Sequence, residues 1–360
     1  MKLVFSTTQQ NKEFGVQLVS KQSLPDNLKT DFADLAEIVD REKFEGKETQ
    51  TLFFINGWRG FDRFLLVGVS EKNTATEKVR NAAGIASRYA QALKTKRISF
   101  LIQKLDNLSM QDASRAIVEA CVLANYSFQK YKTKQDEKKS LVEEIELIAD
   151  YSSEEKKSLE ETLLLCENTN IARDLINDNS ELVTPVYLAE QAQKIAVHAG
   201  LKIKVYDEND LKKMKMNALL AVAQANTTPP RMVVLEWNGN PSGKEKIVLV
   251  GKGICFDTGG LDLKPGDGME TMRYDMSGAA TVLSVLKTAA ELKLKKNIVG
   301  IMGITENLIG EKAYRPGDVL TSMKGLTIEN NSTDAEGRLV LADCLYFAAT
   351  NFSPSLLVSI

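Results

Sequence analysis

Four acidic residues and several cationic ones fall in three short blocks of the second half of the chain. The blocks are 250–264, 272–278 and 331–339, and their acids are Asp257, Asp275, Asp334 and Glu336. Four carboxylates brought together repel one another and stay partly protonated unless cations lie between them. Two divalent ions bridged by carboxylates relieve that repulsion and form a hydrolytic centre. The alternative is that the acids only form salt bridges with Lys252, Lys264 and Arg338.

The three blocks must be brought together by the elements on which they lie. The first block begins at the end of the apolar run Ile247–Val250, which is typical of a buried strand. Four glycines between Gly251 and Gly260 allow the backbone to approach a ligand closely. An open α/β sheet places its ligand in such a turn after a strand. Each of the other two blocks opens a predicted helix, so we expect all four acids to meet in one pocket.

The composition limits the class of protein. The chain has 360 residues, which favours two domains, and a net charge of −2, which gives no support to nucleic-acid binding. Its four cysteines are far apart and form no disulfide framework, so we expect a reducing, cytoplasmic location. We expect neither a signal peptide nor a membrane span. With one histidine, a metal site must use oxygen and amine ligands.

The first 150 residues predict an α/β domain with its own sheet. Two apolar runs, 51–56 and 63–69, predict a hairpin. Helices are predicted over 76–94 and 112–131, a strand over 97–102 and a half-exposed strand over 141–148, where apolar and acidic residues alternate. No phosphate loop is present, which argues against a nucleotide-binding module. The stretch 132–139 is dense in charge and predicts an exposed loop.

Residues 151–177 predict a helix that connects this domain to a second one over 178–360. Thr184 and Pro185 predict a helix start, and Gly200 predicts its end. Strands are expected over 202–206, 232–237, 247–250, 297–304 and 355–360, and helices over 278–293 and 338–350. This alternation indicates α/β domains, each a mostly parallel sheet covered by helices. His198 and the two cysteines Cys255 and Cys344 are expected to be structural.

The run Thr333–Leu339, Thr-Asp-Ala-Glu-Gly-Arg-Leu, and its spacing from the other two blocks resemble the leucyl aminopeptidases, the two-metal cytosol aminopeptidase family. The resemblance runs from about residue 172 to the last residue. It implies that Asp257 and Glu336 bridge two divalent ions, manganese or zinc and possibly magnesium. Asp334 is expected to bind one ion, and Asp275 with the neutral amine of Lys252 the other.

The resemblance also implies roles for four residues beside the ligands. Lys264 is expected to stabilise the charge that develops on the scissile carbonyl, and Arg338 to hold a bicarbonate that acts as general base. Met272 is expected to line the pocket for the first side chain of a peptide. Ser332 stands where the family usually has Asn, near the leaving side of the substrate, which puts substrate preference in question.

We therefore expect a metal-dependent aminopeptidase that releases leucine-like N-terminal residues from peptides, in a family whose members form hexamers. The alternative is a catalytically impaired member with an assembly or DNA-binding role. The sequence ends inside the predicted strand 355–360, whereas the family continues into a loop that lines the substrate pocket. We expect a C-terminally truncated, incomplete catalytic domain with weak or no activity alone.

Overall fold

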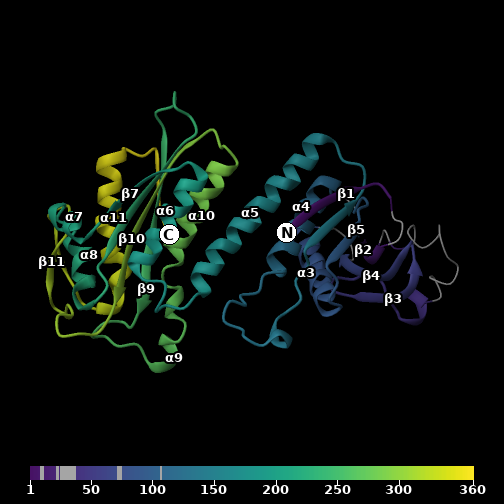
Figure 1. The fold of residues 1–360 in the computed structure, drawn as a ribbon, viewed down its shortest axis with the longest axis horizontal. Helices are drawn as coiled ribbons and strands as arrows, with labels where there is room; N and C mark the ends of the chain where they lie inside the picture. Colours follow the sequence, from purple (N-terminus) through teal and green to yellow (C-terminus); the bar gives the residue numbers. More distant parts are fainter. Residues whose placement is uncertain (9–11, 22–23, 25–37, 71–74, 106–107) are drawn as a thin grey trace. The chain divides into compact units, whose positions relative to one another are not determined.

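The computed structural model describes residues 1–8, 12–21, 24, 38–70, 75–105 and 108–360. The chain divides into two compact units, Met1–Glu167 and Asn168–Ile360. Helix α5 (Ser153–Asn177) begins in the first unit and ends in the second (Figure 1). The structure therefore has the two-unit α/β fold that the sequence predicts, with helices packed on mostly parallel sheets.

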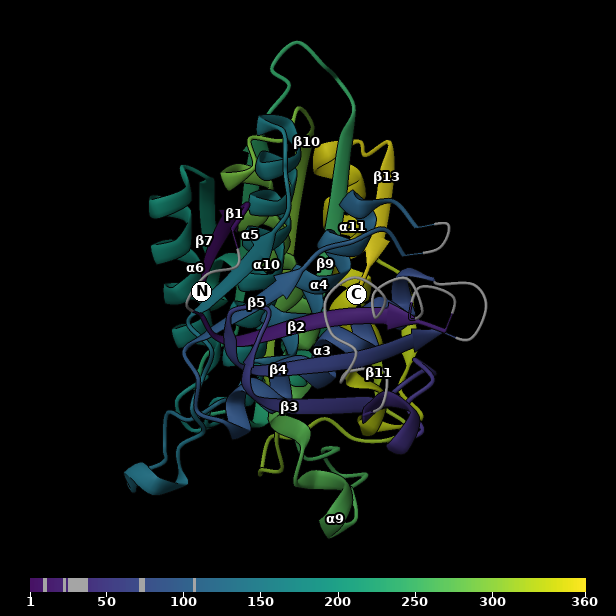
Figure 2. The ribbon, with the colours of Figure 1, turned by 90° about the vertical axis from the view of Figure 1, so that its right-hand side faces the viewer.

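The first unit contains a six-stranded sheet in the order β1-β6-β5-β2-β4-β3. Its elements are β1 (Lys2–Ser6), β2 (Lys12–Ser20), β3 (Thr51–Trp58), β4 (Phe61–Ser70), α3 (Thr76–Ala92), β5 (Arg97–Leu101), α4 (Met110–Ala124), η1 (Gln135–Glu137) and β6 (Glu144–Ile148). All neighbouring strands are parallel except the β3–β4 hairpin, which confirms the hairpin prediction. Figure 2 shows β2, β4 and β3 lying side by side.

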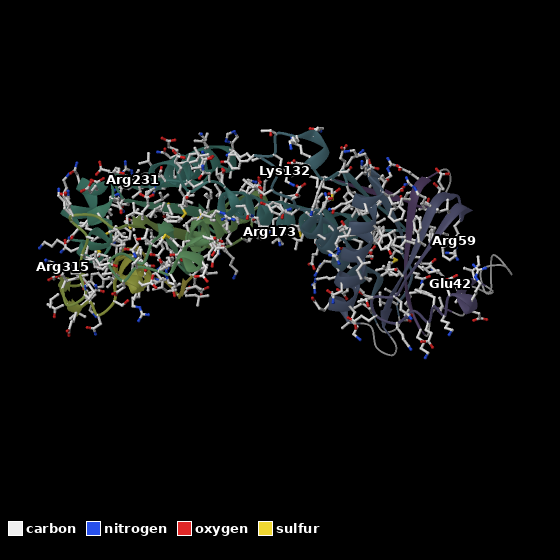
Figure 3. The ribbon with its side chains drawn as sticks, turned by 90° about the horizontal axis from the view of Figure 1, so that it is seen from below. Glu42, Arg59, Lys132, Arg173, Arg231 and Arg315 are labelled. Atoms are coloured by element: carbon white, nitrogen blue, oxygen red, sulfur yellow. The ribbon has the colours of Figure 1, made fainter. Side chains whose placement is uncertain are left out.

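Helices α3 and α4 pack on one face of this sheet and form its main core with strands β2, β4, β5 and β6. The predicted helix 112–131 is seven residues too long at its carboxyl end (131 minus 124), because α4 ends at Ala124. The next residue, Asn125, caps the helix, and its amide side chain bonds to the backbone of Val142 on the approach to β6. The charged stretch 132–139 is mostly exposed, as predicted, and Lys132 is labelled there in Figure 3.

Strand β6 is buried, so the prediction of a half-exposed strand was wrong. The acid that suggested exposure, Glu146, is only 3 % exposed. One of its carboxylate oxygens pairs with the ammonium of Lys12, and the other accepts a hydrogen bond from Ser99 at 2.7 Å. A carboxylate can be buried when it is paired and hydrogen-bonded in this way, so alternation of acids does not guarantee a solvated face.

The second unit contains a five-stranded sheet in the order β13-β9-β10-β8-β7. The strands are β7 (Lys202–Tyr206), β8 (Arg231–Asn238), β9 (Lys246–Asp257), β10 (Asn297–Asn307) and β13 (Leu356–Ser359), and a separate hairpin joins β11 (Val319–Thr321) to β12 (Thr327–Glu329). Strands β13, β9 and β10 are parallel, whereas β8 is antiparallel to both of its neighbours. The second sheet is therefore mixed: the side formed by β13, β9 and β10 is parallel, and the side formed by β10, β8 and β7 is antiparallel.

Helices cover both faces of this sheet (Figure 1). The helices of this unit are α6 (Pro185–Ala199), α7 (Glu208–Lys213), α8 (Asn217–Val222), η2 (Ala223–Ala225), α9 (Gly266–Met269), η3 (Met272–Tyr274), α10 (Ser277–Glu291), η4 (Thr333–Ala335) and α11 (Glu336–Phe352). Helices α6 and α10 form one core with the sheet, and α7, α8 and α11 form the other. The predicted start of α6 is confirmed, because the Thr184 side chain accepts a hydrogen bond from the Tyr187 amide.

Strand β9 continues seven residues beyond the predicted end at Val250, so the first block is mostly strand rather than loop. Its glycines serve close packing: a Cβ on Gly251 would lie 2.5 Å from the carbonyl oxygen of Gly278 at the start of α10. A Cβ on Gly253 would lie 2.7 Å from the Gly303 carbonyl oxygen on β10. Only after Asp257 does the chain leave the sheet, with Gly259 and Gly260 at positive φ.

Three smaller predictions can be compared with the structure. The apolar run 355–360 predicts a buried parallel strand; β13 is parallel to β9 there, but it lies at the sheet edge and is half-exposed. His198 is exposed, and Cys255 and Cys344 are fully buried free thiols. Among the described residues, no helix is long and apolar enough to span a membrane.

Candidate metal centre

The predicted site residues come from strand β9 and the loop after it, and from the starts of two helices. Asp257 is the last residue of β9, and Lys252 lies five residues earlier on the same strand. Asp275 lies just before α10, and Glu336 is the first residue of α11. Asp334 lies in η4, immediately before that helix. Parallel strands end at one edge of the sheet, which is where these elements meet.

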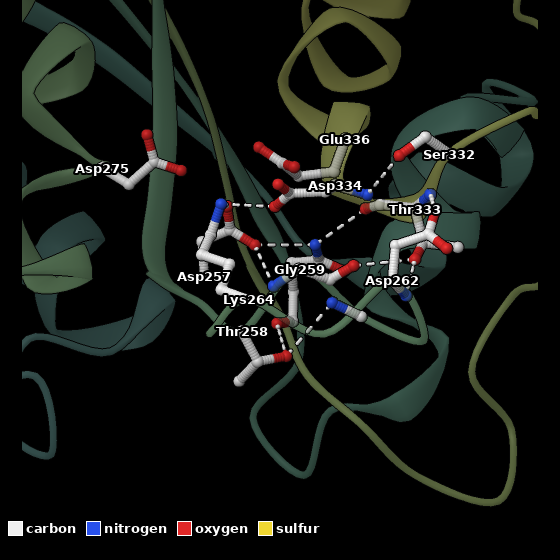
Figure 4. A network of polar contacts seen from close by, with 12 residues as sticks. Asp257, Thr258, Gly259, Asp262, Lys264, Asp275, Ser332, Thr333, Asp334 and Glu336 are labelled. Atoms are coloured by element: carbon white, nitrogen blue, oxygen red, sulfur yellow. Dashed lines mark hydrogen bonds and ion pairs between the residues drawn. The ribbon is translucent and has the colours of Figure 1, made fainter. Parts of the chain in front are cut away.

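Three of the four acids converge. One carboxylate oxygen from each of Asp257, Asp334 and Glu336 lies within 4.8 Å of the other two, and Figure 4 shows the three side chains around one space. Asp257 and Glu336 are buried, whereas Asp334 is exposed. Asp275 is not in this group and lies to one side of it in Figure 4.

Lys252 connects Asp275 to the other acids. Its ammonium nitrogen lies 2.9 Å from Asp275 Oδ2 and 2.7 Å from Glu336 Oε1. The start of α11 must leave room for this side chain, because a Cβ on Gly337 would lie 2.7 Å from Lys252 Cε. A side chain at position 337 would thus collide with Lys252, which explains the glycine in the Thr333–Leu339 run.

Lys264 forms the second bridge between acids. Its ammonium lies 2.9 Å from Asp257 Oδ2 and also pairs with Asp334. Each of the two lysines thus pairs with two carboxylates, so the four acids, when all are ionised, leave an excess of two negative charges (four minus two) in the site. The salt bridges that the sequence offered as an alternative are present for both lysines, whereas Arg338, in the first turn of α11, is exposed and takes no part in them.

Burial perturbs the titration of the site. Burial raises the pKa of Asp275 to about 6, although the ion pair with Lys252 opposes the shift. Burial raises the pKa of Glu336 as well, again against Lys252. For Lys252, burial disfavours the charged form, but the two carboxylates outweigh it and the net pKa is raised. Shifted pKa values of this kind cluster at functional sites.

The donor set fits divalent metal ions. Carboxylate oxygens with one amine suit manganese, magnesium or zinc. Glu336 is 1 % exposed, and its Oε2 atom has no hydrogen-bond partner within the part of the chain that the structure describes. A buried carboxylate oxygen with no donor is costly unless a cation binds it. The unpartnered oxygen and the excess negative charge both indicate that cations belong here.

The remaining predicted residues lie on the rim of this edge. Ser332 is half-buried, and its hydroxyl accepts a hydrogen bond from the Asp334 amide at 3.3 Å. Met272 is half-buried in η3, three residues before Asp275. The hydroxyl of Ser332 therefore acts first as a cap for the turn that carries Asp334.

Four residues at the site were not singled out by the sequence analysis: Asp262, Asn307, Tyr314 and Thr333. Asn307 donates to Asp257 Oδ1 at 2.8 Å, and Tyr314 donates to the Thr333 carbonyl at 2.7 Å. Asp262 and Thr333 bond to each other's backbone amides. The sequence could have indicated Asn307, because this residue follows the predicted strand 297–304 as Asp257 follows the predicted strand 247–250. No sequence pattern indicates Tyr314.

Two family models match the chain: the catalytic domain of the cytosol aminopeptidase family over residues 170–360 and its N-terminal domain over residues 16–135. A probable cytosol aminopeptidase of Geobacter sp. (strain M21) is 40% identical over 331 residues, which are 91% of this chain and 67% of the relative. One of Alkaliphilus oremlandii is 38% identical, over 91% of this chain and 68% of the relative. The chain thus spans about two thirds of the length of these relatives.

Solved structures show the same fold. A tomato leucine aminopeptidase mutant has a TM-score of 0.86 and 28% identity, over 99% of this chain and 72% of that one. A bottromycin maturation enzyme in complex with Mn has a TM-score of 0.82 and 27% identity, over 97% of this chain and 72% of that one. The sequence matches cover both units, and they include the three blocks at the sheet edge. The chain therefore belongs to the cytosol aminopeptidase family, a family of peptidase enzymes.

Proposed function

We propose that this chain carries the dinuclear metal centre of an aminopeptidase that releases leucine-like N-terminal residues from peptides. The observation that carries the proposal is the convergence of Asp257, Asp334 and Glu336 with an excess of negative charge. The proposal assigns the chemistry to residues 178–360, with residues 1–150 as a separate domain and 151–177 as the connector. Cytosolic relatives suggest the same compartment for this chain.

The residues that would hold two divalent ions are the three converging acids together with Asp275 and Lys252. When bound, the ions would supply Lewis acidity and a nucleophilic water. Asp257 and Glu336 are the buried acids, and each faces a different lysine, which suits residues shared by two ions. Manganese is a reasonable choice because a neighbour in fold was solved with Mn. Zinc and magnesium suit the same oxygen donors.

Lys264 and Arg338 are proposed to act on the substrate rather than on the metals. Lys264 extends from the loop after β9, and its side chain is 15% exposed, so it can reach both the acids and a bound peptide. An ammonium there stabilises negative charge on a carbonyl oxygen. Arg338 is exposed at the start of α11, where its planar guanidinium can bind a bicarbonate through two parallel hydrogen bonds. A bicarbonate held there would accept the proton of the attacking water.

The leucine-like preference is assigned to Met272, which is proposed to line the pocket for the first side chain of the peptide. A half-buried thioether there suits an apolar first side chain, because methionine adapts its shape. Ser332 is proposed to face the residue after the scissile bond. The family resemblance extends the proposal to a homohexamer. The molar mass measured by size-exclusion chromatography with light scattering tests this directly.

The proposal is tested by separating metal loss from activity loss. Asp257→Ala should release metal, whereas Lys264→Ala should retain it and lower leucine-amide turnover about 10²–10³-fold, the usual effect of losing one oxyanion donor. Metal content is measured by elemental analysis after dialysis. Lys295→Ala, an exposed lysine of the same unit beyond α10, is the control and should change neither quantity. Equal loss of metal and turnover in Lys264→Ala would refute the role given to Lys264.

A further inference from the structure

One fully buried residue, Thr333, joins the two segments that carry the converging acids. Its hydroxyl donates to the Gly259 carbonyl at 2.7 Å and accepts from the Asp262 amide at 2.8 Å. Its own amide donates to the Asp262 carboxylate at 2.8 Å. These three bonds tie the loop after β9 to the turn before α11, so the positions of Asp257 and Asp334 depend on each other.

Asn307, at the end of β10, bonds to both of these segments. Its amide nitrogen donates to Asp257 Oδ1 at 2.8 Å and to the Thr333 carbonyl at 2.9 Å. Both partners are acceptors, so only the amide NH₂ can face them, and its orientation is fixed by chemistry. Asn307 is fully buried, and the Thr333 carbonyl also accepts from the Tyr314 hydroxyl.

Resting on the proposed function, we infer that Asn307 is a positioning residue that sets the spacing between the metal-ligand segments of β9 and η4. The other oxygen of Asp257 faces Lys264, so the bond from Asn307 fixes which carboxylate oxygen is directed into the site. Hydrogen-bond donors behind a metal-binding carboxylate hold it in place, and their loss typically weakens metal binding 10–100-fold. Tyr314 contributes through the shared carbonyl alone.

The space around Asn307 leaves little room for adjustment. A Cβ on Gly260 would lie 3.1 Å from Asn307 Oδ1 and 2.9 Å from the Thr333 hydroxyl. The loop after β9 thus packs its backbone directly against these two side chains. If Asn307 loses its donor, the loop cannot fill the gap with a side chain of its own, so the two acids lose their fixed spacing.

The test compares two asparagines at β10: Asn307, which ends this strand, and Asn226, which follows η2 and bonds to the same strand. Asn226 also donates two hydrogen bonds to β10, to Thr305 Oγ1 at 3.0 Å and to the Glu306 carbonyl at 2.8 Å, but it contacts none of the acids. Asn307→Leu and Asn226→Leu keep similar side-chain shapes and remove the donors. Mn²⁺ alone is the probe, with its affinity measured by chelator competition and its environment by electron paramagnetic resonance.

We expect Asn307→Leu to weaken Mn²⁺ binding 10–100-fold and to alter the resonance spectrum at saturating Mn²⁺. Asn226→Leu should bind Mn²⁺ as the wild type does, even if it melts at a lower temperature. Tyr314→Phe, which keeps the ring and loses one donor to Thr333, should weaken binding by a smaller factor and serves if Asn307→Leu does not fold.

Two results would overturn the inference: wild-type Mn²⁺ affinity in both Asn307→Leu and Tyr314→Phe, or an equal loss of affinity in Asn226→Leu. A wild-type chain that binds no Mn²⁺ would overturn the proposed function instead, and the inference with it. Because these readouts do not use turnover, a failure of the inference is distinguishable from a failure of the enzyme.

Discussion

The substitution Asp343→Ala should destabilise the second unit more than any change at the surface. Asp343 lies in the middle of α11 and is fully buried. Its Oδ2 accepts hydrogen bonds from the amides of Ala218 at 2.9 Å and Leu219 at 3.1 Å, in the first turn of α8. Its Oδ1 accepts from the Met323 amide at 2.7 Å, between β11 and β12. One carboxylate therefore holds two separate segments against α11.

The expected loss follows from three amides that would lose their acceptor. A buried donor without a partner costs about 1–3 kcal/mol, and water entering the space left by the carboxylate recovers part of that. We therefore expect the free energy of unfolding to fall by about 3–5 kcal/mol, a large share of the roughly 5–15 kcal/mol typical of a domain. Asp343→Asn keeps the shape and one acceptor oxygen, so its loss should be smaller.

The destabilisation should also depend on pH. Burial raises the pKa of Asp343, although the three backbone amides oppose the shift. The folded protein thus binds this proton more readily than the unfolded chain, whose aspartates titrate near ~3.9. The stability that Asp343 contributes is fully present below that value and is lost as pH rises through the raised pKa. The difference between wild type and Asp343→Ala should be larger at pH 4 than at pH 7.

Urea unfolding followed by tryptophan fluorescence measures this difference. The chain has two tryptophans, and replacing Trp58 by Phe leaves Trp237 on β8 as a reporter of the second unit alone. The Trp58→Phe background is the matched control for both variants. A loss below about 1 kcal/mol, or a difference that grows from pH 4 to pH 7, would refute the reasoning.

Three further predictions concern other parts of the two units. Lys293→Gly should raise the free energy of unfolding by about 1 kcal/mol, because Lys293 has a φ of +50° after α10 and a side chain in that region is costly; chemical denaturation checks it. Gly251→Ala should lower it by about 1–3 kcal/mol or more, since the new methyl group would meet the Gly278 carbonyl; thermal melting checks it. Lys12→Ala should cost about 3–5 kcal/mol in the first unit, and adding Glu146→Gln should restore part of it, because the loss comes from an unpaired buried charge; unfolding followed by circular dichroism checks it.

The order of elements and the three acids that converge could be predicted from the sequence, because both follow from local patterns. The cap at Thr184 and the left-handed Gly200 mark the ends of α6, and the structure has them there. The Thr333–Leu339 run and the block 250–264 hold the three acids that converge at the sheet edge, and Lys252 links them to Asp275 of the block 272–278. Periodicity and spacing are enough for such features, since they depend on neighbours in the chain.

Other features depend on partners that are distant in sequence. Gly251 and Gly253 were predicted to lie in a loop. They are needed because the backbones of α10 and β10 pack against them, and those backbones lie many residues away in the sequence. Glu146 looked solvated because its partner, Lys12, is more than 100 residues earlier. Tyr314 gives no local signal at all, since it reaches the Thr333 carbonyl from an irregular segment. Contacts of this kind are decided by packing, and no short pattern encodes them.

The contact of Gly251 with Gly278 also bears on how this protein can be engineered. Lys252 and the start of α10 are fixed to each other by two backbones with no side chain between them. The chain that connects them through residues 265–271 is mostly exposed, and a side chain on Gly266 would meet nothing within 4 Å. Insertions at Gly266 should therefore leave both anchors in place. A library of loop lengths at this position could vary the segment 265–271 while the packing of β9 against the start of α10 stays unchanged.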